Sequence, residues 1–132
     1  MTSKRYQIMV VDDSQSMRAA AVSALGEAYE VMTCEDGMDA IARVASFRPD
    51  LVFMDIAMPR LDGYESVALM RMNDAFRDVP VIMMSSKGGA FDIAKGALLG
   101  FDGHIIKPFE SKEMLGIAQR FLHPSNAINP HG

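Results

Sequence analysis

The stretch Ile8-Met9-Val10-Val11-Asp12-Asp13-Ser14 decides what fold to expect of this chain. Consecutive apolar residues lead directly into two carboxylates and a hydroxyl. A continuous apolar run, unlike an alternating one, is typical of a strand buried on both faces of a parallel sheet. The polar residues after it would lie at the carboxyl end of the strand, which is where open parallel sheets bind their ligands.

Further short apolar runs recur along the chain, separated by segments of helical pattern. They are Val31-Met32, Leu51-Val52-Phe53-Met54, Val81-Ile82-Met83-Met84 and Ile105-Ile106. Apolar residues at spacings of three and four between and after the runs predict amphipathic helices. Five strand–helix units in series predict an α/β fold, a doubly wound five-stranded parallel sheet with right-handed crossovers and helices on both faces.

The last two predicted helices each carry an apolar stripe. In the earlier helix, which Gly96 weakens, the stripe consists of Phe91, Ala94, Leu98 and Leu99. In the later helix it consists of Met114, Leu115, Ala118, Phe121 and Leu122. Apolar side chains at this spacing lie on one face of a helix, so we expect most of their area to be core, with Phe91, Met114 and Leu115 as candidates for apolar docking.

The composition narrows the class of protein. A length of 132 residues suits one domain. The net charge of -4 disfavours direct nucleic-acid binding, and the single cysteine permits no internal disulfide. No apolar run approaches the ~20 residues of a membrane span, and the N-terminus lacks the apolar stretch of a signal peptide. We therefore expect a cytoplasmic protein without membrane insertion, with a domain over 7–122, an extension at 1–6 and a flexible tail at 123–132.

Polar residues follow the predicted strands at the points where they end. These residues are Asp12 and Asp13, then Asp55, then Ser85 and Ser86, then Lys107 and Pro108. Carboxylates that gather at one edge repel one another and raise one another's pKa, which a divalent cation such as Mg²⁺ would relieve. A lysine and a serine hydroxyl suit phosphoryl oxygens. The set predicts metal-assisted phosphoryl transfer with a carboxylate as candidate nucleophile.

Each of these residues alone also fits a structural role. Adjacent aspartates after a strand often cap the next helix, although Ser14 could take that cap instead. A single aspartate at a strand end is usually a turn residue, and the serines and the lysine could be solvated loop residues. It is their convergence on one edge of the sheet that favours a functional site.

With these motifs the chain resembles the receiver domain of bacterial two-component response regulators. The matching segments are Val10-Val11-Asp12-Asp13-Ser14, Met54-Asp55-Ile56-Ala57-Met58-Pro59, Leu61-Asp62-Gly63, Pro80-Val81-Ile82-Met83-Met84-Ser85 and Lys107-Pro108-Phe109. They run in family order over about 7–122, and the resemblance implies a flavodoxin-like (βα)5 domain. The run from Met58 to Tyr64, with Ser85-Ser86-Lys87, is most similar to stand-alone regulators of chemotaxis and of type IV pilus twitching systems.

The resemblance also implies roles for individual residues. Asp55 would accept a phosphoryl group from a histidine kinase or a phosphotransfer domain. Asp12 and Asp13 would hold Mg²⁺, or Mn²⁺ as a substitute, together with Asp55 and the backbone carbonyl of Ala57. The Ser85 hydroxyl would move to the phosphoryl oxygen. Lys107 would pair with the phosphoaspartate, and the peptide bond from Lys107 to Pro108 would be cis.

The chain departs from the family pattern at a few positions. His104 stands three residues before the lysine, where the family usually has a tyrosine or phenylalanine switch, so it is either a switch residue or a solvated edge histidine. Ser86 replaces a small apolar residue and is either a bystander or a second donor. Ala57 and Lys87 occupy positions that tune dephosphorylation in relatives. An output protein is expected to dock on roughly 90–122.

Two other functions remain open on the residues alone. An aspartate-nucleophile phosphohydrolase would carry a second aspartate two residues after the first, but Asp55 is followed by Ile56 and Ala57. A phosphorylation-independent adaptor would keep the fold without needing the intact site. We therefore expect a signalling switch whose only catalysis concerns its own phosphorylation and dephosphorylation.

Overall fold

A computed structural model describes residues 5–86 and 90–124. Within them the chain forms five strands: β1 (Gln7–Val11), β2 (Glu30–Cys34), β3 (Leu51–Asp55), β4 (Val81–Ser85) and β5 (Gly103–Ile106). All neighbouring strands pair in parallel, in the order β2-β1-β3-β4-β5. The predicted doubly wound sheet is confirmed, and each apolar run of the sequence lies in one strand.

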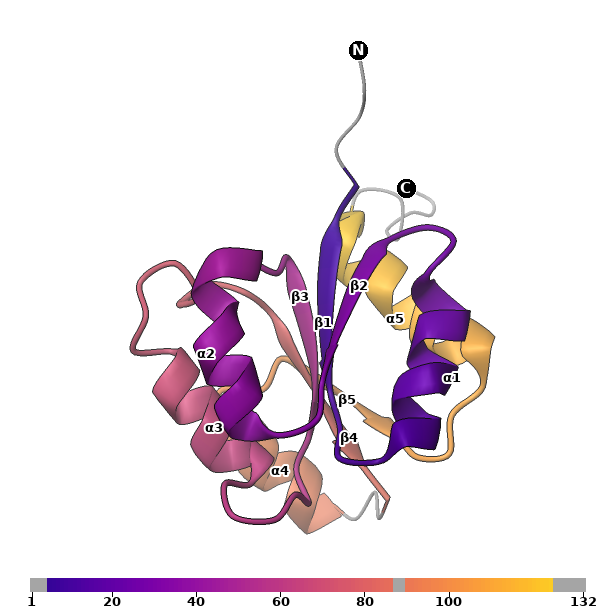
Figure 1. Ribbon diagram of the computed structural model, residues 1–132. Helices are drawn as coiled ribbons and strands as arrows, with labels where there is room; N and C mark the ends of the chain where they lie inside the picture. Colours follow the sequence, from indigo (N-terminus) through magenta and orange to yellow (C-terminus); the bar gives the residue numbers. More distant parts are fainter. Residues whose placement is uncertain (1–4, 87–89, 125–132) are drawn as a thin grey trace.

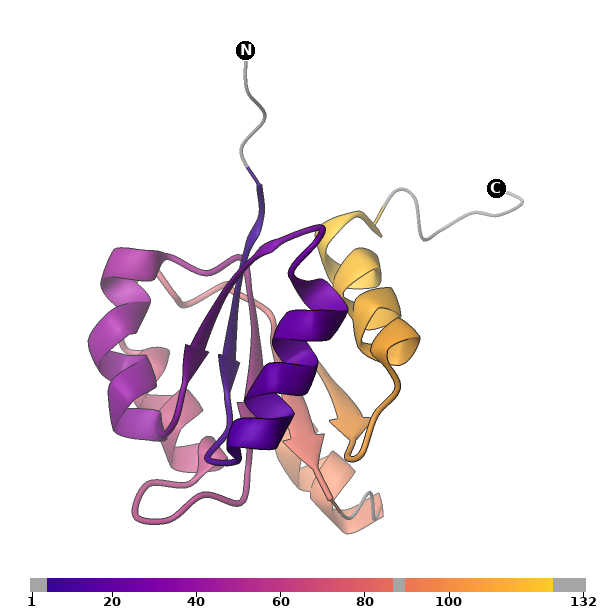
Figure 2. The same cartoon turned by 45° about the vertical axis from the view of Figure 1, so that its right-hand side comes forward.

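Five helices cover the sheet in two layers. They are α1 (Gln15–Leu25), α2 (Gly37–Phe47), α3 (Gly63–Met70), α4 (Ala90–Leu98) and α5 (Ser111–Leu122). Helices α1 and α5 cover one face, and α2, α3 and α4 cover the other (Figures 1 and 2). Every strand runs in the same direction, so all carboxyl ends meet at the lower edge of the molecule in Figure 1.

The helix starts explain why the carboxylates after the strands are available. Ser14 is the N-cap of α1, and its hydroxyl accepts a hydrogen bond from the backbone N–H of Met17. Asp12 and Asp13 therefore lie in the turn before the helix rather than in its cap. Helix α3 begins in the same way with its own residues, because Asp62 and Glu65 form a reciprocal capping box.

Two separate apolar cores lie on the two faces of the sheet. The core under α1 and α5 contains aliphatic and aromatic side chains such as Leu25, Phe53 and Ile117. The core under α2, α3 and α4 is richer in methionine, with the buried members Met9, Met54, Met58, Met70 and Met83. Methionine is unbranched and adapts to irregular gaps, so this second core tolerates changes in the helices above it more readily.

The expectation for the apolar stripes is confirmed for α5 and wrong for α4. Met114 and Ala118 of α5 are fully buried. In α4, by contrast, Phe91 is 78% exposed and Leu98 is 87% exposed. The side of α4 that contacts the sheet carries Gly96 instead, where an added Cβ would lie 2.8 Å from the sulfur of Met83. A residue without a side chain allows the close approach, which leaves the apolar stripe on the far side.

Arg71, the C-cap residue of α3, joins two connections at the opposite edge of the sheet. Its Nη1 donates hydrogen bonds to the carbonyls of Phe76 and Val79 in the connection to β4. Its Nη2 donates to the carbonyl of Gly100, between α4 and β5. The C-terminal end of α4 is therefore anchored to the core even though its apolar stripe is not covered.

Candidate functional site

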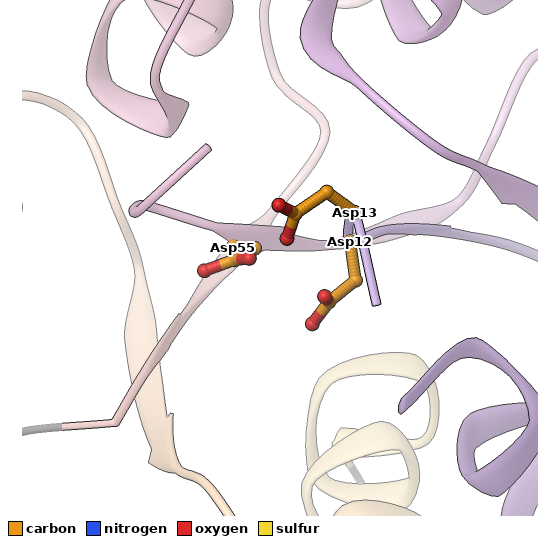
Figure 3. Close-up of side chains that lie close together, drawn as sticks. All are labelled: Asp12, Asp13 and Asp55. Carbon is orange, nitrogen blue, oxygen red and sulfur yellow. The ribbon is translucent and has the colours of Figure 1, made fainter. Parts of the chain in front are cut away.

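Three carboxylates gather at the carboxyl ends of the two central strands. Asp12 and Asp13 follow β1, and Asp55 is the last residue of β3, which pairs with β1. One oxygen from each carboxylate lies within 4.8 Å of the others. Figure 3 shows Asp12 and Asp13 together at the end of their strand, with Asp55 across from them. Asp12 and Asp55 are buried, whereas Asp13 is exposed, so the cluster opens to solvent on one side.

Asp12 is held at every polar atom. Its backbone N–H donates to the carbonyl of Cys34 at the end of β2 (3.1 Å), and its carbonyl accepts from Arg18 Nη1 (2.7 Å). The carboxylate Oδ1 accepts from the backbone N–H of Ser14 (2.8 Å). The other oxygen, Oδ2, lies 3.1 Å from Lys107 Nζ. A fully buried carboxylate is costly unless its oxygens have hydrogen-bond or ion-pair partners, and both oxygens of Asp12 have them.

Lys107 connects β5 to the carboxylates. Its Nζ lies 3.1 Å from Asp12 Oδ2 and 3.4 Å from Asp55 Oδ2, and the side chain is 15% exposed. Burial by itself would lower the pKa of Lys107, but the hydrogen bond and charge of Asp12 and the charge of Asp55 outweigh it and raise that pKa. The peptide bond to Pro108 is cis. The lysine therefore stays positively charged between two carboxylates.

The pKa of Asp55 is raised to about 6. Burial is the largest cause, and the charge of Asp12 adds to it. The backbone N–H of Ala57, 3.1 Å from Oδ1, and the ammonium of Lys107 act in the opposite direction. Burial makes the Asp55 carboxyl costly to ionise, so a group that neutralises its charge acts strongly there.

The remaining predicted residues lie at different depths around this cluster. Ser85 is buried at the end of β4, and its carbonyl accepts a hydrogen bond from the backbone N–H of Lys107 (2.8 Å). Ser86 and Ala57 are exposed beside the cluster. Lys87, predicted to tune dephosphorylation, lies outside the described residues.

His104 is not part of the carboxylate cluster. It lies on β5 opposite Met83 of β4 and is exposed. It lines a cavity of about 210 Å³ between α4 and the sheet, which Ile93, Gly96 and Phe101 also line. Ser85 of β4 pairs with Ile106 of β5. His104 lies two residues before Ile106, so it is offset from the Ser85 hydroxyl toward the start of β5.

The donor set of the cluster fits a hard divalent cation. Mg²⁺ binds carboxylate and carbonyl oxygens, and one or two protein carboxylates are enough because water and phosphate oxygens complete its shell. Among the described residues, three carboxylates with facing oxygens and one lysine, Lys107, form the charged part of the cluster. Asp12, Asp13 and Asp55 are the residues that would hold such an ion here.

Two close contacts of the site were not predicted from the sequence. The first is the hydrogen bond from Arg18 to the Asp12 carbonyl, which nothing in the helical pattern indicated. The second is Gly63, where an added Cβ would lie 2.3 Å from the Asp55 carbonyl oxygen. The motif Leu61-Asp62-Gly63 could have pointed to it, since a glycine at the first helical position admits a close backbone approach. The first turn of α3 therefore packs directly on the backbone of Asp55.

A doubly wound parallel sheet that brings a buried aspartate, two further carboxylates and a half-buried lysine to one edge is the arrangement expected of an α/β signalling domain with a phosphoacceptor aspartate. A family model for the response regulator receiver domain matches residues 8–119. The chain belongs to this family, as the motifs of the sequence predicted.

The chain is similar to proteins that it covers almost completely and also to longer regulators of which it covers about half. It is 48% identical to Protein PilG of Pseudomonas aeruginosa over 115 residues, which cover 86% of this chain and 85% of that protein. The solved structure of chemotaxis protein CheY4 of Vibrio cholerae superposes with a TM-score of 0.86 at 31% identity, covering 89% of this chain and 99% of that one. The DNA-binding response regulator MtrA of Mycobacterium tuberculosis is 33% identical over 87% of this chain, which spans 50% of MtrA.

Proposed function

We propose that the protein is a response regulator that accepts a phosphoryl group on Asp55 from a histidine kinase or a phosphotransfer domain. The observation that carries the proposal is the position of Asp55, buried at the end of β3 within reach of two other carboxylates and 3.4 Å from Lys107 Nζ. Phosphorylation would replace a carboxylate that burial disfavours with a group of about two negative charges and additional acceptor oxygens.

The chemistry assigns a task to each residue of the site. As the bond from phosphorus to the donor's leaving atom breaks, an Asp55 carboxylate oxygen forms the new bond to phosphorus. A bound Mg²⁺, held by Asp12, Asp13, Asp55 and the Ala57 carbonyl, would offset the charge of the carboxylates and the phosphoryl oxygens. Lys107 already lies between Asp12 and Asp55, and would turn toward the new phosphoryl oxygens.

The signal would leave the site through the hydroxyl of Ser85. A hydroxyl that gains a phosphoryl oxygen as partner only in the phosphorylated state favours the conformation in which it reaches that oxygen. Ser86 could donate a second hydrogen bond. If His104, on β5 beside the cavity under α4, takes part in the switch, His104→Ala should change the partner affinity of the phosphorylated protein. Unchanged affinity would exclude His104 from the switch.

The output partner would be a protein that docks on α4, β5 and α5, roughly 90–122. The side chains that support this surface are the uncovered apolar ones: Phe91, Leu98 and Ile106, of which Ile106 is 42% exposed. Its resemblance to PilG and CheY4 favours control of pilus motility or a chemotaxis-like response. Within the described residues no helix is long and apolar enough to cross a membrane. A cytoplasmic location without direct nucleic-acid contact is part of the proposal.

The test is chemical labelling of the acceptor. Incubation with a small phosphodonor and Mg²⁺ should add one phosphoryl group, stable in acid and labile in base, and mass spectrometry should locate it on Asp55. Asp55→Asn should abolish labelling. Asp74→Asn, at an exposed surface position, is the matched control and should label normally.

The outcomes distinguish the proposed function from its two alternatives. No adduct on the wild-type protein, under conditions that label a known receiver, would favour a phosphorylation-independent adaptor. Rapid turnover of varied phosphate esters would favour a phosphohydrolase, although position 57, two residues after Asp55, is an alanine where such an enzyme needs a second acid.

A further inference from the structure

Arg18, outside the predicted site, contacts the residue on which the carboxylate cluster is built. It lies in α1, one turn after the N-cap, and its side chain extends back toward the start of the helix, as helical side chains tend to do. There its Nη1 donates a hydrogen bond of 2.7 Å to the backbone carbonyl of Asp12, in a partly buried contact. The guanidinium thereby joins α1 to the end of β1.

The carbonyl that Arg18 contacts has a particular position in the chain. It belongs to the peptide unit that joins Asp12 to Asp13, and a peptide unit is planar. Fixing its oxygen therefore fixes the direction in which the backbone continues to Asp13. Asp12 has further restraints on its carboxylate, from Ser14 and Lys107. Asp13 is exposed, so the plane of this peptide is an important restraint on where its carboxylate lies.

The charge of Arg18 also suits this position. A cation near the N-terminal end of a helix is unfavourable with respect to the helix dipole. Here the carboxylates of Asp12 and Asp13 lie at the same end and provide the compensating negative charge. Arginine stays protonated at every accessible pH and donates in a fixed planar geometry, so it can hold a carbonyl beside an acidic cluster without exchanging protons with it.

We propose that Arg18 is a positioning residue for the divalent-cation site, acting through the peptide unit between Asp12 and Asp13. It sets the two carboxylates at the angle at which both reach one ion, and it touches neither the ion nor the phosphoryl group. The inference rests on the proposed function, because it assumes that the cluster binds Mg²⁺.

The experiment compares Arg18→Met with Arg18→Lys and with a matched control. Arg120→Met removes the same charge from an exposed position of α5. Mg²⁺ binding to each protein, first stripped with a chelator, is measured by titration calorimetry. Residues that orient metal ligands typically change metal affinity by 10–100-fold, so Arg18→Met should raise the dissociation constant for Mg²⁺ by about 10-fold. Arg18→Lys should recover part of that loss, and Arg120→Met should bind as the wild type does.

A second measurement separates positioning from a general loss of structure. In phosphodonor labelling, Arg18→Met should need about 10-fold more Mg²⁺ for the half-maximal rate and should approach the wild-type rate at saturation. A dissociation constant within twofold of the wild type, with or without a lower melting temperature, would overturn the inference and leave the proposed function intact. If Arg18→Met does not fold, Arg18→Lys is used, and unchanged Mg²⁺ affinity in that variant has the same consequence. A wild-type protein that binds no Mg²⁺ would overturn both.

Discussion

Helices α4 and α5 lie on opposite faces of the sheet near its β5 edge, and each carries an apolar stripe, but only the stripe of α5 is covered. Met114 of α5 is fully buried in the core, whereas Leu98 of α4 is 87% exposed. The contact residue accounts for the difference, since α4 approaches Met83 through Gly96, while Gly116 of α5 has nothing within 4 Å of an added Cβ. An apolar stripe therefore predicts a helix, and the smallest residue of the helix can decide which side faces the sheet.

The largest effect on stability should come from truncating a side chain in the buried apolar stripe of α5. Met114→Ala removes a fully buried side chain from the core under α5 and should lower the free energy of unfolding by about 2 to 5 kcal/mol. Equilibrium urea unfolding measures this change. A loss below about 1 kcal/mol, the range of an average substitution, would mean that α5 packs no more tightly than α4.

A substitution at the site changes stability without involving either helix. Asp55 has a pKa of about 6 in the folded protein against an ordinary value of 3.8, so the folded state holds its proton more strongly than the unfolded state does. Its contribution to stability is therefore largest below pH 4 and is lost as the pH rises through 6. At pH 8, without divalent cations, Asp55→Asn should be more stable than the wild type by up to about 3 kcal/mol.

The pH dependence of that difference is the stringent part of the prediction. Urea unfolding of both proteins at pH 4, 6 and 8 should show the gap close as the wild-type carboxyl becomes protonated. A constant gap across this range would mean that Asp55 titrates near its ordinary pKa and that burial does not disfavour its charge. Added Mg²⁺ should narrow the gap at pH 8, because only the wild type gains the full set of carboxylate ligands.

The site could be predicted from the sequence because it depends on few facts. Knowing that Asp12, Asp55 and Lys107 each follow a strand of a parallel sheet is enough to place them at one edge, whatever the helices do. The contact from Arg18 to the Asp12 carbonyl could not be predicted in this way, because it depends on the path of α1 and on the rotamer of one long side chain. Strand order and strand ends follow from pattern, whereas single hydrogen bonds follow from packing.

The stripe of α4 was assigned to the wrong side for a related physical reason. Periodicity counts apolar residues and gives no weight to Gly96, although the missing Cβ is what lets α4 approach Met83. The same periodic rule succeeded for α5, where the large apolar residues themselves fill the space over the sheet. Hydrophobic periodicity therefore predicts the sheet-facing side of a helix reliably where large side chains contact the sheet, and unreliably where the helix backbone does.

Alanine substitutions at Gly116 of α5 and Gly96 of α4 should differ in their effect on stability by a smaller amount. Gly116→Ala adds a Cβ in open space on α5 and should stabilise the protein by about 0.5 to 1 kcal/mol, the usual gain from alanine in a helix. Gly96→Ala places a Cβ 2.8 Å from the Met83 sulfur, so the flexible Met83 side chain must shift and the stabilisation should be smaller than for Gly116→Ala. Thermal unfolding of both variants gives the comparison. Equal stabilisation by the two substitutions would show that α4 does not approach the sheet through Gly96.

The smallest effect on stability should come from truncating a side chain in the exposed apolar stripe of α4. Leu98→Ala removes a side chain that is already 87% exposed, so the free energy of unfolding should change by less than about 0.5 kcal/mol, as for surface positions in general. Urea unfolding, measured at two protein concentrations, checks this and detects self-association. A loss comparable to that of Met114→Ala would show that the stripe is covered in solution. If stability is unchanged while binding of an output protein weakens, the stripe of α4 serves recognition and that of α5 serves folding.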